Sequence, residues 1–83
     1  MKRWIHAGAF DGICTETVKA AGRDIIKTYE NFKCSVSQSG EDIMTVTISD
    51  KISKKQTKIS LSCSNDSSYS ARQKMLAAYL GLN

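Results

Sequence analysis

The middle of this chain alternates between apolar and polar residues with a period of two. Three such runs lie between Phe32 and Cys63. Because successive side chains of a strand point to opposite faces, each run predicts a strand with one buried and one solvated face. The apolar set is Cys34, Val36, Met44, Val46, Ile48, Ile59, Leu61 and Cys63, and the polar set is Lys33, Ser35, Ser37, Thr45, Thr47, Ser49, Lys58, Ser60 and Ser62.

Amphipathic helical patterns flank the three strands. Before them, apolar residues recur at steps of three and four and predict a helix from Thr15 to Asn31, with Thr15 as its N-cap. These residues are Val18, Ala21, Ile25, Tyr29 and Phe32. After them, a polar break at 65–68 offers several N-caps for a second helix. Gly81 fits the left-handed residue that ends many helices.

The connections between the strands are short, which favours antiparallel hairpins in sequential order. Since the sheet offers one apolar face, both helices are expected to cover it, with Gly22 allowing close approach. The prediction is an α+β fold, a two-layer α-β-β-β-α sandwich. A short strand at Arg3 to Ala7 is a possible addition at a sheet edge. Trp4 and Phe10 either complete the core or form an exposed partner site.

Length and composition indicate one small domain covering residues 1–83. Apolar residues make up 41% and charged residues 24%, as in an ordinary soluble globular protein. No run is long enough to span a bilayer, and the opening segment lacks an apolar signal-peptide core. Cys14, Cys34 and Cys63 are widely spaced, which favours reduced, core-packing thiols in a cytoplasmic protein over a metal site or a disulfide.

The order of elements resembles that of the double-stranded-RNA-binding domain. Residues 32–82 align with it, Ser39-Gly40 falls in the first hairpin loop, and residues 74–82 resemble the family's closing AKxxAAxxAL pattern. The resemblance implies shape-based contacts to RNA from the first helix, the first hairpin loop and lysines that open the second helix. Only Lys74 matches one of those lysines, and the loop carries Glu41 and Asp42 in place of the family's histidine. Residues 1–7 also resemble the starts of small uncharacterised proteins of Gram-positive gut bacteria and their mobile elements.

Basic residues gather in two places, against a net charge of +4. The second hairpin loop holds the densest cluster, Lys51, Lys54, Lys55 and Lys58, and the helices carry Lys19, Arg23, Arg72 and Lys74. These residues are candidates for phosphate contacts, and the two groups could join into one positive strip. The alternative, which we favour for each group separately, is a solvated loop that protects the sheet edge and the ordinary charged face of a helix.

The polar strand face carries no aromatic residue on which a base could stack. Its hydroxyls could instead bind a protein, an open strand edge could accept a partner's strand, and a weak homodimer through an edge is conceivable. His6 and Cys14 could form a base and a nucleophile, but nothing supplies the other parts of a catalytic site. No motif for a cofactor or metal is present.

The sequence therefore predicts a non-enzymatic binding module without a cofactor. The first hypothesis is electrostatic binding to duplex RNA or DNA. The alternative is a protein-interaction or regulatory module of a bacterial or mobile-element system.

Overall fold

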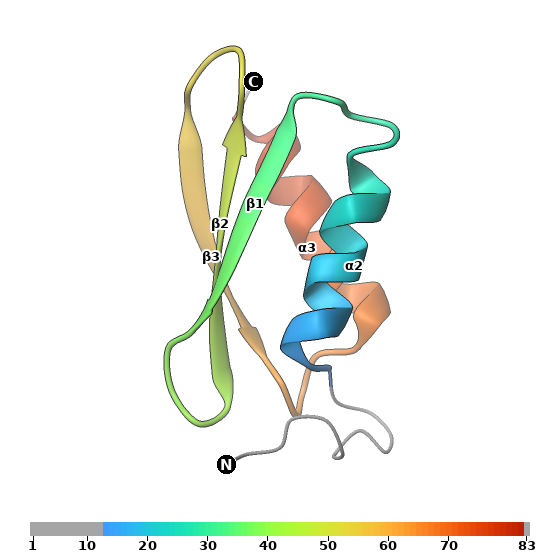
Figure 1. Cartoon of the computed structure of the whole chain (residues 1–83). Coiled ribbons are helices and arrows are strands. Elements are labelled where there is room, and N and C mark those ends of the chain that lie inside the picture. Colours follow the sequence, from blue (N-terminus) through green and yellow to red (C-terminus); the bar gives the residue numbers. More distant parts are fainter. Residues whose placement is uncertain (1–12, 83) are drawn as a thin grey trace.

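The computed structural model describes residues 13–82. A helix, three strands and a second helix follow one another along the chain (Figure 1). They are α2 (Thr15–Ile25), β1 (Phe32–Gln38), β2 (Ile43–Asp50), β3 (Gln56–Ser62) and α3 (Ser68–Leu80). The predicted α-β-β-β-α order and α+β class are confirmed. The expected strand at Arg3 to Ala7, with Trp4 and Phe10, lies outside the described residues.

The three strands form one antiparallel sheet in the order β1-β2-β3. Val36 pairs with Val46, which in turn pairs with Ile59, so the apolar positions of all three strands share rows across the sheet. Met44, Val46 and Ile48 on the central strand are completely buried. The two edge strands are less covered, and Ile59 is only partly buried. The alternating pattern therefore predicted the faces of the sheet correctly.

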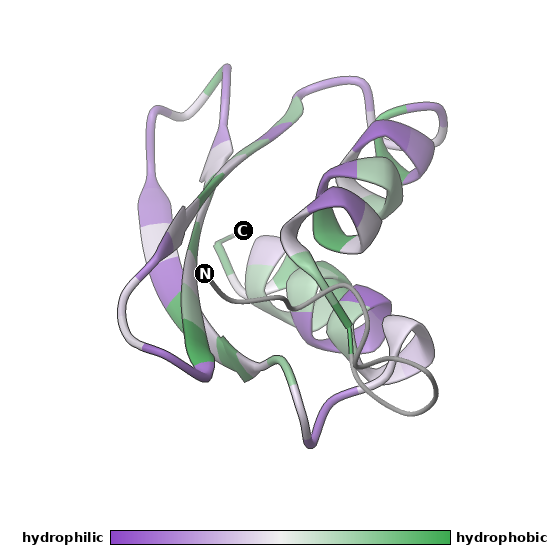
Figure 2. Cartoon of the chain, turned by 60° about the horizontal axis from the view of Figure 1, so that its bottom comes forward, coloured by the Kyte–Doolittle hydropathy of each residue, from purple (hydrophilic) through white to green (hydrophobic). Residues whose placement is uncertain are grey.

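Both helices pack on the same face of the sheet, as Figure 2 shows from one end of the molecule. Helix α2 lies against β1 and α3, and helix α3 lies against β2 and β3. The core between the layers includes Val18, Ile25, Phe32, Leu61, Ala71 and Met75. We call the opposite face of the sheet, which neither helix covers, the outer face.

Gly22 brings α2 close to the sheet, as its mid-helix position suggested. A Cβ atom at this residue would lie 2.6 Å from the Cys34 sulfur on β1. That separation is far below a van der Waals contact, so any other residue would force the helix or the thiol to move. Glycine here sets the spacing between α2 and β1.

The first helix ends earlier than predicted. It stops at Ile25 rather than Asn31, because the chain then tightens into three-residue turns, with Thr28 N–H donating to Ile25 C=O at 3.0 Å. The periodic apolar residues beyond the helix still reach the core. Tyr29 and Phe32 meet the Tyr79 ring edge to face, with centroids 5.7 and 5.3 Å apart. Burial, not helical conformation, explains the continued periodicity.

The helix ends correct two further predictions. Cys14, not Thr15, occupies the N-cap of α2, and Gly81 has a right-handed φ of −70° because the chain continues a helical turn there. Ser67 caps α3 by a reciprocal pair of hydrogen bonds with Ser70. Within residues 13–82, no helix combines the length and the apolar character needed to cross a membrane.

Candidate functional site

The loop between β2 and β3 is a tightly hydrogen-bonded turn. Asp50 N–H donates to Lys55 C=O at 3.1 Å, and Lys54 N–H donates to Asp50 C=O at 2.9 Å. Lys54 has a φ of 66°, the left-handed conformation that closes the turn, and no other described residue has a positive φ. The backbone that carries these lysines is thus fixed by its own hydrogen bonds.

Asp50 also ties this loop to helix α3. One carboxylate oxygen accepts the Ser53 N–H at 3.1 Å, and the other accepts the Tyr79 hydroxyl at 3.1 Å. The hydrogen bond from Ser53 N–H lowers the pKa of the Asp50 carboxyl, although burial opposes that shift. An ionised, buried carboxylate therefore holds the turn against the core.

Strand pairing places a fifth lysine, Lys33 of β1, beside the four lysines of the loop cluster. Lys33 on β1 pairs with Ser49 on β2, and Ser49 pairs with Gln56 on β3, which makes one polar row across the outer face. This row borders a hollow of about 310 Å³ lined by Lys33, Ser49, Asp50, Lys51, Lys54 and Gln56. Lys33 was not among the residues predicted for a site. The strand alternation had placed it on the polar face, but only the register brings it to Lys51.

We call the set of Lys33, Lys51, Lys54, Lys55 and Lys58 the lysine end. None of the five forms an ion pair with any residue in the described part of the chain. Of the described residues that line the hollow, Asp50 alone carries a carboxylate, and both its oxygens already accept hydrogen bonds. The lysine end therefore concentrates uncompensated positive charge beside hydroxyl and amide donors, a combination suited to anions such as phosphate.

The two other cations predicted for this surface lie elsewhere. Arg72 forms an ion pair with Asp24 of α2, and the Lys74 ammonium lies 2.8 Å from an Asp66 oxygen. Helix α3 begins at the opposite end of the molecule from the β2–β3 loop and lies across the sheet from the outer face (Figure 1). The structure therefore does not join Arg72 and Lys74 to the lysine end in one positive strip.

Two aspartates and their serine partners occupy the end where α3 begins, which we call the aspartate end. Asp66 accepts hydrogen bonds from Ser62 N–H at 2.7 Å and from the Ser70 hydroxyl at 3.0 Å. Asp42 accepts hydrogen bonds from the Ser62 hydroxyl at 2.9 Å and from the Cys63 thiol at 2.9 Å. These hydrogen bonds connect the end of β3 to the β1–β2 loop and to the start of α3.

The same bonds shift the titration of both carboxyls. Burial is the largest influence on the Asp66 carboxyl and opposes ionisation, but the hydrogen bonds from Lys74, Ser62 and Ser70 together lower its pKa. The thiol of Cys63 is the largest cause of the lowered pKa of Asp42. The aspartate end is thus a satisfied structural network.

Lys19 and Arg23 line a groove between α2 and β1. Lys19 lies 4.0 Å from Glu16, and both side chains are largely exposed, so this pair contributes little. Arg23 has no ion pair with a described residue. These two predicted site residues therefore line a groove that shares Lys33 with the lysine end but none of its other four lysines.

The described residues contain no assembled metal site. Cys14, Cys34 and Cys63 form no disulfide, and no cluster of three or more metal-ligating side chains occurs in the described part. Burial raises the pKa of the Cys34 thiol, as expected of a packing cysteine. His6, the proposed partner of Cys14, lies outside the described residues.

Comparison with protein-family models, with curated proteins and with solved structures finds no match for this chain.

Proposed function

We propose that this protein binds the phosphate backbone of duplex RNA or DNA through the lysine end. The observation that carries the proposal is the grouping of five lysines, none ion-paired with a described residue, at one end of the outer face. Each lysine that meets a phosphate releases condensed counterions, which gives an affinity that falls as salt rises. No enzymatic step is part of this function.

The composition of the outer face argues for contact with phosphates rather than with bases. Its side chains are serines, threonines, lysines, Gln56 and Ile43, and none of these offers a ring for stacking. Hydroxyls donate hydrogen bonds to phosphate oxygens without reading sequence. The expected binding is therefore weak and independent of sequence, with a Kd of roughly 10⁻⁴ to 10⁻⁶ M.

The helical surface that the double-stranded-RNA-binding domain uses is less suited to this role here. Arg72 and Lys74 are neutralised by Asp24 and Asp66. The β1–β2 loop adds Glu41 and Asp42, which repel phosphates. The remaining positive charge on α2 lies beside the groove at β1.

The test is a fluorescence anisotropy titration of labelled duplex RNA and duplex DNA at about 50 and 200 mM salt. A triple variant, Lys33→Gln with Lys51→Gln and Lys58→Gln, removes three charges from the lysine end. The matched control, Lys19→Gln with Arg23→Gln and Lys27→Gln, removes two charges from α2 and one from the turn that follows it. We expect the first variant to weaken binding about tenfold or more and to reduce the salt slope by about 2 to 3. The control should stay within about threefold of the wild type at equal salt.

Two results would overturn the proposal. One is the absence of binding at about 100 μM protein in low salt, which is weaker than nonspecific binding usually is. The other is a larger loss from the α2 control than from the lysine-end variant, which would place the contact on the helices. Circular dichroism of each variant checks that its fold is unchanged.

A further inference from the structure

Strand β1 is an edge of the sheet, and its backbone pattern can be assigned residue by residue. Ser39 N–H donates to Ile43 C=O and Lys51 N–H donates to Asn31 C=O, both at 2.9 Å. In this register, 39 and 43 form one opposed pair and 31 and 51 form another. Antiparallel pairs alternate between hydrogen-bonded and non-hydrogen-bonded, so the odd residues of β1 bond to β2.

The even residues of β1 therefore direct their backbone groups away from β2. Phe32 N–H is taken by Tyr29 C=O at 2.9 Å. Cys34, Val36 and Gln38 follow, and no strand among residues 13–82 pairs with this edge. An edge with N–H and C=O groups at every second residue is a template for one more strand.

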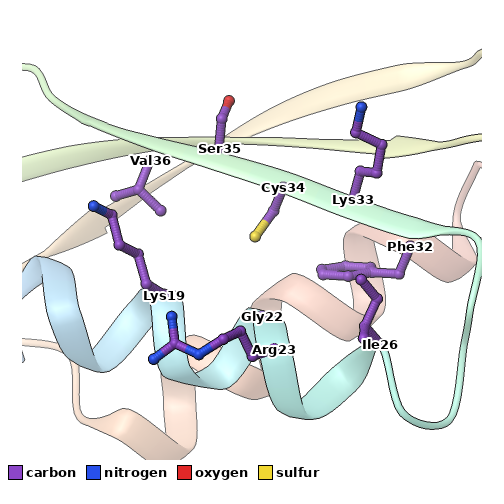
Figure 3. A pocket seen from close by; sticks show the side chains of 9 residues that line it. All are labelled: Lys19, Gly22, Arg23, Ile26, Phe32, Lys33, Cys34, Ser35 and Val36. Carbon is purple, nitrogen blue, oxygen red and sulfur yellow. The ribbon is translucent and has the colours of Figure 1, made fainter.

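A groove of about 510 Å³ runs beside this edge, between β1 and α2. Phe32, Cys34 and Val36 point toward α2, whereas Lys33 and Ser35 point to the outer face (Figure 3). The lining is mostly apolar and includes Ile26, which is 40% exposed. A strand added at this edge would place every second side chain over the groove.

Charge decides which segment fits. Lys19 and Arg23 extend from α2 along the groove side of β1. Lys33 extends from the opposite side of β1 (Figure 3). Among residues 13–82, no carboxylate lines the groove. A strand that brings acidic side chains would meet a cation on each face of β1.

We propose that the β1 edge and the groove beside it form a docking site for an extended acidic peptide segment of a protein partner. The peptide pairs with Cys34, Val36 and Gln38 through its backbone. It places small apolar side chains against Val36 and Ile26, and carboxylates beside Lys19 and Arg23. This mode gives affinity through the main chain and specificity through alternate side chains.

Two other occupants fit the charges less well. A second copy docked through its own β1 would bring its Lys33 close to the cations of the groove. Strand β1 has the sequence FKCSVSQ and carries no acid to offset that repulsion. The first seven residues of the chain contain Lys2 and Arg3 and also carry no acid. Both would bring like charges to the groove.

The probe is a fluorescein-labelled octapeptide, titrated by anisotropy, with serine at every second position and valine and glutamate in turn at the others, so that one face of the strand carries both valine and glutamate. The comparison peptides are the same sequence with lysine in place of glutamate, and the acidic peptide with two alternate residues replaced by proline. We expect the acidic peptide to bind at least about tenfold more tightly than either, because the first comparison loses the charge match and the second loses main-chain donors.

Two protein variants locate the site. Lys19→Gln with Arg23→Gln, both on the exposed side of α2, should weaken peptide binding about tenfold. Lys51→Gln with Lys54→Gln and Lys58→Gln, which keeps all three cations that line the groove, should change it by less than the α2 pair does. Amide NMR shifts on peptide addition should concentrate at Cys34, Val36 and Gln38. The peptide and the duplex are separate probes and are tested with different variants, so failure of the peptide to bind leaves the nucleic-acid proposal standing.

Three outcomes would overturn the docking site. The basic peptide could bind as well as the acidic one, the proline peptide could bind as well as its parent, or the amide shifts could fall on the β2–β3 loop. Salt-insensitive self-association in sedimentation, with amide shifts on dilution at Cys34, Val36 and Gln38, would assign the edge to a second copy. That result also overturns the proposal.

Discussion

The aspartate end and the lysine end of this molecule use charge in opposite ways. At the aspartate end, Asp66 is nearly buried and accepts hydrogen bonds from the backbone, a hydroxyl and the Lys74 ammonium. At the lysine end, five ammonium groups have no carboxylate partner among the described residues. The charges of the aspartate end stabilise the fold, whereas those of the lysine end are available to a ligand.

The difference shows why a basic residue cannot be interpreted without its neighbours. The resemblance to the double-stranded-RNA-binding domain predicts an RNA contact for Lys74, yet Asp66 lies 2.8 Å away and shares its charge. Lys33 belongs to no basic run, yet strand pairing sets it beside the hollow. The following predictions test this contrast, from the largest expected effect to the smallest.

Acid should destabilise the protein, and the aspartate end should account for much of the loss. The carboxyls of Asp42 and Asp66 have lowered pKa values in the fold. Their stabilisation is therefore present above the unfolded pKa of about 4 and is lost as pH falls through the lower folded pKa. Urea unfolding at pH 7, 5 and 3 should show a steep loss below about pH 4. An Asp42→Asn, Asp66→Asn variant should be less stable at pH 7 but less sensitive to acid, and an equal sensitivity would contradict the assignment.

Removing one carboxylate from the aspartate end should lower the free energy of unfolding more than removing one cation from the lysine end. Asp66→Ala leaves Ser62 N–H without its acceptor and should lower the free energy of unfolding by about 1–3 kcal/mol. Lys51→Ala should change it by less than about 0.5 kcal/mol, since its exposed side chain has no described partner. Chemical denaturation at pH 7 measures both, and similar losses would mean that the lysine end is also structural.

Relief of backbone strain at the lysine end should stabilise the protein. Lys54 has a φ of 66°, which a glycine adopts without steric cost. Lys54→Gly should therefore raise the free energy of unfolding by about 0.5–1 kcal/mol. Lys55→Gly, next to it, relieves no positive φ and should lower stability. A gain at both positions would show that loss of charge, rather than backbone strain, is responsible.

Repulsion among the unpaired lysines should produce the smallest effect. Lys33→Gln removes one charge from the rim of the hollow and should stabilise the protein by a few tenths of a kcal/mol, roughly the size of other exposed pair interactions. The gain should vanish at about 0.5 M salt, where screening is nearly complete. Lys74→Gln should destabilise instead, because it removes a paired cation. Thermal melts of both variants at low and high salt give the comparison.

The sequence predicted the sheet well because period-two alternation reports directly on which face is buried. It predicted the first helix less well. Tyr29 and Phe32 continue the apolar spacing past Ile25, yet they reach the core from a turn and from a strand. The spacing of apolar residues predicts which residues are buried, but it does not predict the hydrogen bonds that end a helix.

The lysines illustrate the same limit for the candidate sites. The loop cluster was visible in the sequence because its members are neighbours in the chain. The distance from that cluster to Arg72, and the nearness of Lys33, depend on strand register and on which end of the sheet each loop occupies. Those relations are between segments far apart in sequence, and no local pattern encodes them.

By itself, the sequence determined the order of the elements, the buried face of each strand and the excess of positive charge, since these follow from the character and spacing of neighbouring residues. Only the tertiary structure decided which charges are neutralised, because an ion pair such as that of Arg72 with Asp24 joins helices that the sheet separates in the chain. Only the fold, likewise, made an edge of β1 and set a groove beside it, because the edge follows from the strand order and the groove from the packing of α2 against β1 at Gly22.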